Sequence, residues 1–107
     1  EDNASGCSGV VELADVLSTR NLARSVLFVC VSGEEQGLQG GGDVAQTMMN
    51  DGRLANTRLV MNLDMIGYSA DNDFDVVIET EPEFETILNQ FALAAATYVP
   101  DLRVVQD

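Results

Sequence analysis

The sequence predicts an α/β fold in which helices pack on a mostly parallel mixed sheet. Two observations support this prediction. Helical patterns alternate along the chain with short apolar runs, and two of these runs, residues 25–31 and 59–63, lack the polar alternation of a half-exposed strand. With 107 residues, of which 46% are hydrophobic, residues 1–107 are expected to form a single domain with a modest core.

The first predicted helix begins near the N-terminus, where Asn3 or Ser5 can accept hydrogen bonds from its first turn, and runs to about Leu22. Its apolar residues recur at helical spacing, and the stripe consists of Val10, Leu13, Ala14 and Leu17. Residues 25–31 then predict a strand that is buried on both faces.

The middle of the chain predicts a second helix and a second buried strand. The helix is expected from about Asp43 to Asn50, because Asp51-Gly52 supplies a stop signal. The glycines at 40–42 are expected to form a flexible lead into it. Residues 59–63 predict the strand, which ends at Asp64.

The last third of the chain predicts a strand, a helix and a further strand. A turn at residues 71–73 precedes the strand at 74–78. Pro82 and the acidic residues around it suit the first turn of a helix that continues to about Tyr98. Its stripe of Phe84, Leu88, Phe91 and Ala95 is expected in the core, and residues 102–105 begin the last strand.

The ionisable composition is strongly acidic, with 18 Asp and Glu, five Arg, no Lys and no His, for a net charge of −13. A chain without histidine cannot by itself hold a Ser-His-Asp site or a histidine-bearing zinc site. The charge also argues against nucleic acid and against an anionic membrane surface as partners. Cations remain, either metal ions or a substrate amine. Alternatively, the acidity serves only solubility.

Two cysteines, Cys7 and Cys30, are too few for a disulfide framework. Each lies in a stretch with a regular helix or strand pattern. We therefore expect two small buried thiols rather than a bridge.

Four carboxylates fall where a metal site could form. Glu34 and Glu35 directly follow the first predicted strand, Asp64 follows the second, and Asp2 lies in the loop before the first helix. Ligands of open α/β sheets bind at the carboxyl ends of the strands. Like charges gathered there repel one another and require a countercharge, for which a divalent metal or a pair of metals is suitable.

The Glu34-Glu35 doublet adds a second argument. Neighbouring side chains of an extended chain point in opposite directions, so one carboxylate can bind metal while the other stays off it. The second carboxylate can then accept a proton from a water, as the general base of a metallohydrolase does.

Three sequence blocks resemble the co-catalytic zinc aminopeptidases of clan MH, which include bacterial leucyl aminopeptidases and the glutamate carboxypeptidase relatives. The blocks are Asp2-Asn3-Ala4-Ser5-Gly6, Gly33-Glu34-Glu35-Gln36-Gly37-Leu38 and Asn62-Leu63-Asp64-Met65-Ile66-Gly67, in the order of the family. The resemblance implies a phosphorylase/hydrolase-like zinc exopeptidase core, of which this chain would be an incomplete part.

The resemblance implies a role for each carboxylate. Asp2 corresponds to the ligand that bridges two zinc ions, and its peptide bond to Asn3 is cis in relatives. Glu35 and Asp64 correspond to the terminal ligands, one for each zinc ion. Glu34 corresponds to the general base, and the implied substrate is a peptide with a free N-terminus.

The family completes its site with two histidines, one upstream of the Asp2 block and one downstream of Asp64. Since this sequence has no histidine, we expect it to be an internal fragment of a zinc peptidase catalytic domain. The 107-residue chain is then expected to be inactive alone, with partial or no zinc occupancy. Many relatives are secreted or periplasmic, and the fragment, with exposed strand edges, is expected to be prone to self-association.

Three other interpretations are open. The chain could be an acidic non-catalytic interaction module that has kept peptidase motifs. Residues 40–45 fit G-x-G-x-x-A, with Asp64 about 20 residues on, as in a dinucleotide-binding domain, although Glu34 and Glu35 would repel a pyrophosphate. A calcium loop starting at Asp71 would need Gly and Glu where Val76 and Pro82 stand.

Overall fold

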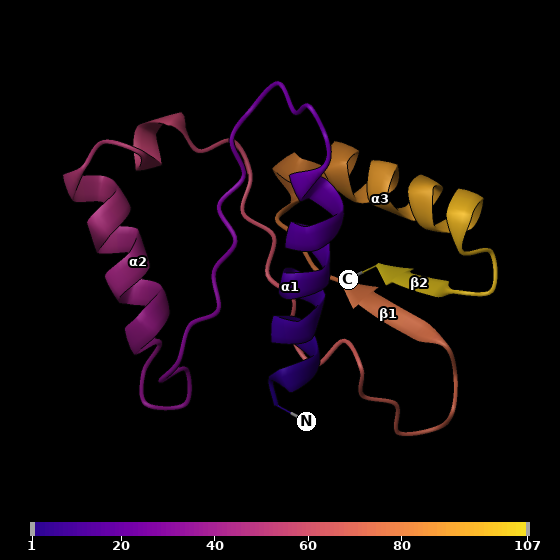
Figure 1. The fold of residues 1–107 in the computed structure, drawn as a ribbon. Helices are drawn as coiled ribbons and strands as arrows, with labels where there is room; N and C mark the ends of the chain where they lie inside the picture. The colour runs from indigo at the N-terminus through magenta and orange to yellow at the C-terminus, as the bar shows by residue number, and fades with distance from the viewer. Residues whose placement is uncertain (1, 107) are drawn as a thin grey trace. The chain divides into compact units, whose positions relative to one another are not determined.

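The computed structural model describes residues 2–106 and divides into two compact units. The first unit ends at Gly67 and the second begins at Tyr68. Figure 1 shows the helices and strands of each unit. All four predicted site carboxylates belong to the first unit.

Helix α1, Ala4–Ser18, opens the first unit. Asn3 caps it, because its side-chain oxygen accepts a hydrogen bond from the Gly6 N–H. The helix ends four residues earlier than the predicted Leu22. The hydroxyls of Ser18 and Thr19 donate to the carbonyls of Asp15 and Val16, which offers the last turn an alternative to further helical bonds.

Helix α2, Gln39–Asn50, begins earlier than predicted and is followed by the short 3₁₀ helix η1, Leu54–Asn56. The glycines at 40–42 therefore lie inside the helix, and their assignment to a flexible lead was wrong. Gly40 allows this start, because its N–H donates to the Ser32 carbonyl oxygen at 3.0 Å and an added Cβ would lie only 2.5 Å from that oxygen. The helix ends at Asp51-Gly52, as predicted, with Gly52 at φ 79°.

The two predicted buried strands of this unit do not form among the described residues. Residues 25–31 and 59–63 have no strand pairing, and most of their large apolar side chains are exposed. The apolar pattern predicts burial, but a strand also needs a hydrogen-bonding neighbour, and neither segment pairs with another described one. Both still run in the same direction, toward the end of the unit at which α1 begins (Figure 1).

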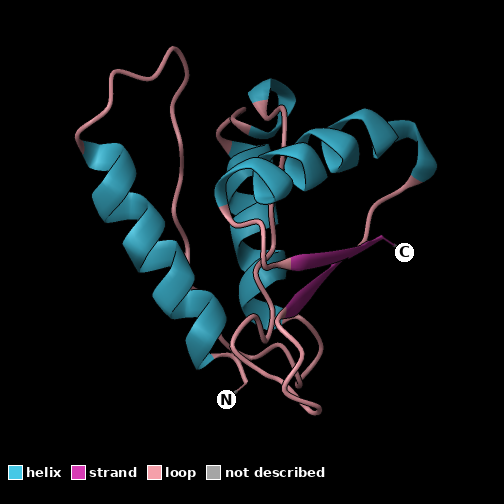
Figure 2. Cartoon of the chain, turned by 90° about the vertical axis from the view of Figure 1, so that its right-hand side faces the viewer, coloured by secondary structure: helices cyan, strands magenta, loops and turns pink. Residues whose placement is uncertain are grey.

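The second unit is a parallel β-α-β arrangement (Figure 2). Strand β1, Asp75–Ile78, leads through the 3₁₀ helix η2, Pro82–Phe84, into α3, Glu85–Tyr98, and then into β2, Arg103–Gln106. In the register, Asp75 pairs with Arg103 and Ile78 with Gln106. These elements confirm the predicted order of strand, helix and strand. The sheet of the described residues thus has two parallel strands, whereas the sequence predicts a larger, mostly parallel mixed sheet.

Burial is confined to a few positions. Leu88 and Ala95 of α3 are buried, as predicted, whereas Phe84 and Phe91 of the same stripe are more than a third exposed. In α1 the small Gly6 is buried. No helix within residues 2–106 is long and apolar enough to cross a membrane.

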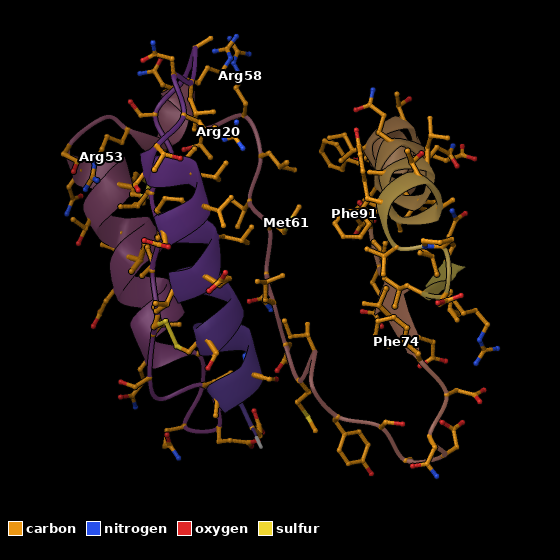
Figure 3. The ribbon with its side chains drawn as sticks, turned by 45° about the vertical axis from the view of Figure 1, so that its right-hand side comes forward. Arg20, Arg53, Arg58, Met61, Phe74 and Phe91 are labelled. Carbon is orange, nitrogen blue, oxygen red and sulfur yellow. A yellow bond between two sulfur atoms is a disulfide. The ribbon has the colours of Figure 1, made fainter. Side chains whose placement is uncertain are left out.

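A disulfide joins Cys7 of α1 to Cys30 of the segment beside it (Figure 3). Their Cα atoms are 5.7 Å apart, a usual separation for a bridge. The prediction of two free thiols was therefore wrong. The spacing of the two cysteines in the sequence does not indicate that the first helix and residues 25–31 lie against each other at Cys7 and Cys30.

Candidate functional site

The side chain of Asn3 connects the start of α1 to the residues on either side of Asp64. Its Nδ2 donates to the Leu63 carbonyl oxygen at 2.8 Å, and its Oδ1 accepts from the Met65 N–H at 3.1 Å. The same Oδ1 accepts from the Gly6 N–H at 2.9 Å. We call these three hydrogen bonds the Asn3 clamp. Because Asp2 precedes Asn3 and Asp64 lies between Leu63 and Met65, the clamp joins the chain segments that carry both aspartates.

Two glycines of α1, Gly6 and Gly9, allow the helix to approach the turn around Asp64. A Cβ at Gly6 would overlap the Leu63 carbonyl oxygen and Asn3 Oδ1, so the close contact requires glycine at this position. A Cβ at Gly9 would lie 3.0 Å from Ile66 Cδ1 and 3.2 Å from Leu63 Cδ1. These atoms are the ends of flexible side chains and can move. The backbone contact at Gly6 is therefore the stricter of the two.

The peptide bond between Asp2 and Asn3 is cis, as the resemblance implied. Met65 has a positive φ of 47°, in the left-handed region that non-glycine residues rarely occupy. The Met65 N–H donates to the clamp in this conformation. Met65 directly follows Asp64 along the chain.

The sequence did not indicate the clamp itself. Asn3 was expected only to cap the first helix, yet its amide also holds two residues about 60 positions away. A capping Asn, unlike Ser or Thr, combines a carbonyl acceptor with an NH₂ donor. That difference is the signal that could have identified its second role.

Glu34 and Glu35 lie in the turn before α2, and both are exposed. The Glu34 carbonyl oxygen accepts from the N–H groups of Gly37 and Leu38, at 3.0 and 2.8 Å. Gly33 and Gly37 take positive φ values of 73° and 101°, which glycine adopts without steric cost. This turn ends the segment at residues 25–31 and reverses the chain into α2.

The Glu34-Glu35 turn, the turn around Asp64 and the start of α1 lie at the same end of the first unit (Figures 1 and 3). The Cys7–Cys30 disulfide attaches the segment leading to Glu34 to α1, one helical turn beyond Asn3. The Asn3 clamp attaches the residues around Asp64 to the same end of the helix. These contacts concern the chain segments, and the common site of the four carboxylates stays a prediction.

A zinc ion in a protein usually has four donors from His, Cys, Asp or Glu. Asp2, Glu35 and Asp64 offer carboxylate oxygens, which zinc accepts, but the sequence has no histidine to complete a set. Within the part of the chain that the structure describes, no three His, Cys, Asp or Glu side chains come together as a metal-binding group. In this arrangement the described residues therefore supply only part of the donor set that a zinc ion needs.

The glycines that the dinucleotide interpretation requires, at residues 40–42, do not form a loop. Gly40, Gly41 and Gly42 form the first turn of α2, and the acidic Glu34-Glu35 turn separates that helix from residues 25–31. The calcium interpretation is also disfavoured. The Asp71 side chain accepts from the Asp73 N–H, and the Asp73 carboxylate pairs with Arg103 at 3.2 Å.

Comparison with known proteins gives a consistent result. The model of peptidase family M28 matches residues 1–105. A probable zinc metalloprotease of Pyricularia oryzae is 44% identical over 68 residues, which cover 64% of this chain and 13% of that protein. Probable zinc metalloproteases of Leptosphaeria maculans and Pyrenophora tritici-repentis are each 38% identical, over 68 and 72 residues.

These two alignments cover 64% and 67% of the chain, and 15% and 16% of the fungal proteins. The chain thus spans 13–16% of the length of the three relatives described. No solved structure gives a significant match.

Proposed function

Because the chain belongs to peptidase family M28, we propose that it carries the carboxylate ligands and the general base of a zinc aminopeptidase site. The family implies zinc as the metal and peptides as substrates, and the fungal relatives are named as probable zinc metalloproteases. Removal of N-terminal residues from peptides is the finer proposal. It rests on the resemblance of three motif blocks to aminopeptidases.

The Asn3 clamp is the observation that supports this proposal most directly. A site of the proposed kind needs Asp2 and Asp64 at one place, although they are 62 positions apart in the sequence. The amide of Asn3 bonds to both neighbours of Asp64 and is itself the neighbour of Asp2. A chain that used these acids only for solubility would have no need for such a contact.

Glu34 and Glu35 divide the remaining roles. We assign Glu35 as a metal ligand and Glu34 as the base that takes a proton from the attacking water. Both carboxylates are exposed in the turn, so water and substrate can reach them. The two histidines of the family site are not among the residues of this chain, and we therefore expect no turnover by the 107-residue chain alone.

An acidic interaction module without catalysis is the second candidate. The observation that favours it is the lack of a three-donor metal group among residues 2–106. The two candidates predict different losses of zinc uptake when individual carboxylates are removed. In a bare acidic module any exposed carboxylate contributes about equally, whereas the proposed site depends on Asp2, Glu35 and Asp64.

Zinc uptake measured by isothermal titration, with Asp2→Ala and Asp15→Ala as a matched pair, tests the proposal. Both aspartates are exposed and near α1, and both variants lose one negative charge. We expect weak uptake by the wild-type chain that falls with Asp2→Ala and is unchanged with Asp15→Ala. Equal effects of the two variants would support the interaction module instead. Hydrolysis of an aminoacyl-anilide by the purified chain would contradict the need for histidine.

A further inference from the structure

The Cys7–Cys30 disulfide joins two parts of the first unit that other polar contacts leave separate. In one part, the Asn3 clamp holds the turn around Asp64 to the start of α1. In the other, two backbone hydrogen bonds of 3.0 Å attach residues 32–33, just before the Glu34-Glu35 turn, to the start of α2. Away from the two cysteines, no hydrogen bond or ion pair within residues 2–106 connects α1 with residues 25–61.

The bridge shortens the covalent path between α1 and the Glu34-Glu35 turn. Along the backbone, Ser18 at the end of α1 and Glu34 are 16 positions apart, whereas Cys30 and Glu34 are only four positions apart. An extended chain spans at most about 3.5 Å per residue, which allows Glu34 about 56 Å from the end of α1 but only about 14 Å from the bridge. The effective concentration of the turn at the start of α1 therefore depends on the bridge.

We propose that the Cys7–Cys30 disulfide is a redox-sensitive switch of the candidate site. When oxidised it holds the Glu34-Glu35 turn near the start of α1, and when reduced it releases the turn. This role of the disulfide rests on the proposed function, in which the turn supplies a metal ligand and the general base. The segments of Asp2 and Asp64 stay joined in the reduced chain, because the hydrogen bonds of the Asn3 clamp do not involve sulfur.

Two molecules of a small thiol, such as reduced glutathione, supply the two electrons and two protons for this reduction. The thiolate of the first attacks the sulfur of Cys30, which is the more exposed of the two residues, and forms a mixed disulfide. The sulfur–sulfur bond to Cys7 breaks, and Cys7 leaves as a thiolate that takes up a proton. The second thiol attacks the mixed disulfide, so the products are two cysteine thiols and one small disulfide.

The test is isothermal titration of zinc into the bridged wild-type chain and into an unbridged chain that carries Cys7→Ser and Cys30→Ser. Serine avoids free thiols, which bind zinc themselves. In the bridged chain, Glu35→Ala should weaken zinc binding by about three- to tenfold, the effect of one exposed carboxylate on a divalent ion. In the unbridged chain, Glu35→Ala should have no effect, whereas Asp2→Ala should weaken zinc binding in both chains.

Two results would contradict the switch in different ways. Equal losses from Glu35→Ala in the bridged and the unbridged chain would overturn the switch alone and leave Glu35 as a ligand. No loss from Glu35→Ala in the bridged chain would overturn the ligand role of Glu35 in the proposed function, and the switch with it.

Hydrogen exchange of the wild-type chain, before and after treatment with reduced glutathione, gives a second measurement that needs no variant. After reduction the Met65 amide should keep its protection, because its hydrogen bond to Asn3 Oδ1 does not depend on the bridge. Loss of Met65 protection would show that the bridge supports the whole unit rather than the Glu34-Glu35 turn, and would overturn the proposal. A bridge that glutathione reduces only after the chain is unfolded in urea would overturn it too.

Discussion

Substituting Gly6 by Ala tests whether the Asn3 clamp holds the candidate site together. An added Cβ at Gly6 would overlap the Leu63 carbonyl oxygen and Asn3 Oδ1, and would lie 2.7 Å from Asn3 Nδ2. Atoms do not approach a Cβ closer than 3.0 Å in real structures, so the helix and the Leu63 backbone must separate. Because neither side is the free end of a flexible chain, the three hydrogen bonds of the clamp are lost together.

The magnitude follows from those bonds. Three hydrogen bonds of 2.8, 2.9 and 3.1 Å contribute about 0.5–1.5 kcal/mol each to the free energy of unfolding. Alanine in a helix is favoured over glycine by about 1 kcal/mol, which offsets part of the loss. Gly6→Ala should therefore lower the free energy of unfolding by about 0.5–3.5 kcal/mol.

The matched control is Gly41→Ala in α2, where an added Cβ would meet nothing within 4 Å. That variant should raise stability by up to about 1 kcal/mol, through helix propensity alone. Urea unfolding followed by circular dichroism gives both values, and amide exchange of Met65 reports the clamp directly. If Gly6→Ala were as stable as Gly41→Ala and Met65 stayed equally protected, the clamp would have no energetic role.

Two further predictions concern the core and the pH dependence. Leu88→Ala should lower the free energy of unfolding of the second unit by about 2–4 kcal/mol, because the Leu88 side chain is only 8% exposed. Leu93, which is 69% exposed on the same helix, is the control, and Leu93→Ala should change the free energy little. Thermal unfolding of the two variants measures the difference. The hydrogen bond and charge of Arg53 hold the pKa of the Asp51 carboxyl below its ordinary value near 3.8. This pair therefore supports the end of α2 above that value, and its contribution is lost as the pH falls through the lowered pKa. In an NMR titration, Arg53→Gln should raise the pKa of Asp51 toward its ordinary value, because the backbone N–H of residue 53 still donates to the carboxylate.

Local structure followed from the sequence wherever short-range chemistry decides it. Capping by Asn3, the stop at Asp51-Gly52 and the helix start at Pro82 were all predicted within a few residues. The order of strand, helix and strand in the second unit was predicted, because a helix with an apolar stripe between two apolar strands has one simple arrangement. Errors at helix ends, as at Ser18, arose from side-chain hydroxyls that compete for the last carbonyls.

Residues 25–31 show where such reasoning fails. Their composition predicts a buried strand, but composition reflects only the preference of the side chains for burial. Pairing depends on whether another backbone forms hydrogen bonds with this segment, and none does among the described residues. The Cys7–Cys30 bridge was missed for a related reason, since it depends on the packing of two segments 23 positions apart.

The sequence by itself determined the charge, the lack of histidine, the three motif blocks and therefore the family. Each of these is a property of residue types and their spacing along the chain. Only the tertiary structure decided that the Asn3 side chain bonds to both neighbours of Asp64 and that Gly6 must lack a Cβ. The physical reason is that a hydrogen bond between residues about 60 positions apart depends on distances in space, which sequence spacing does not encode.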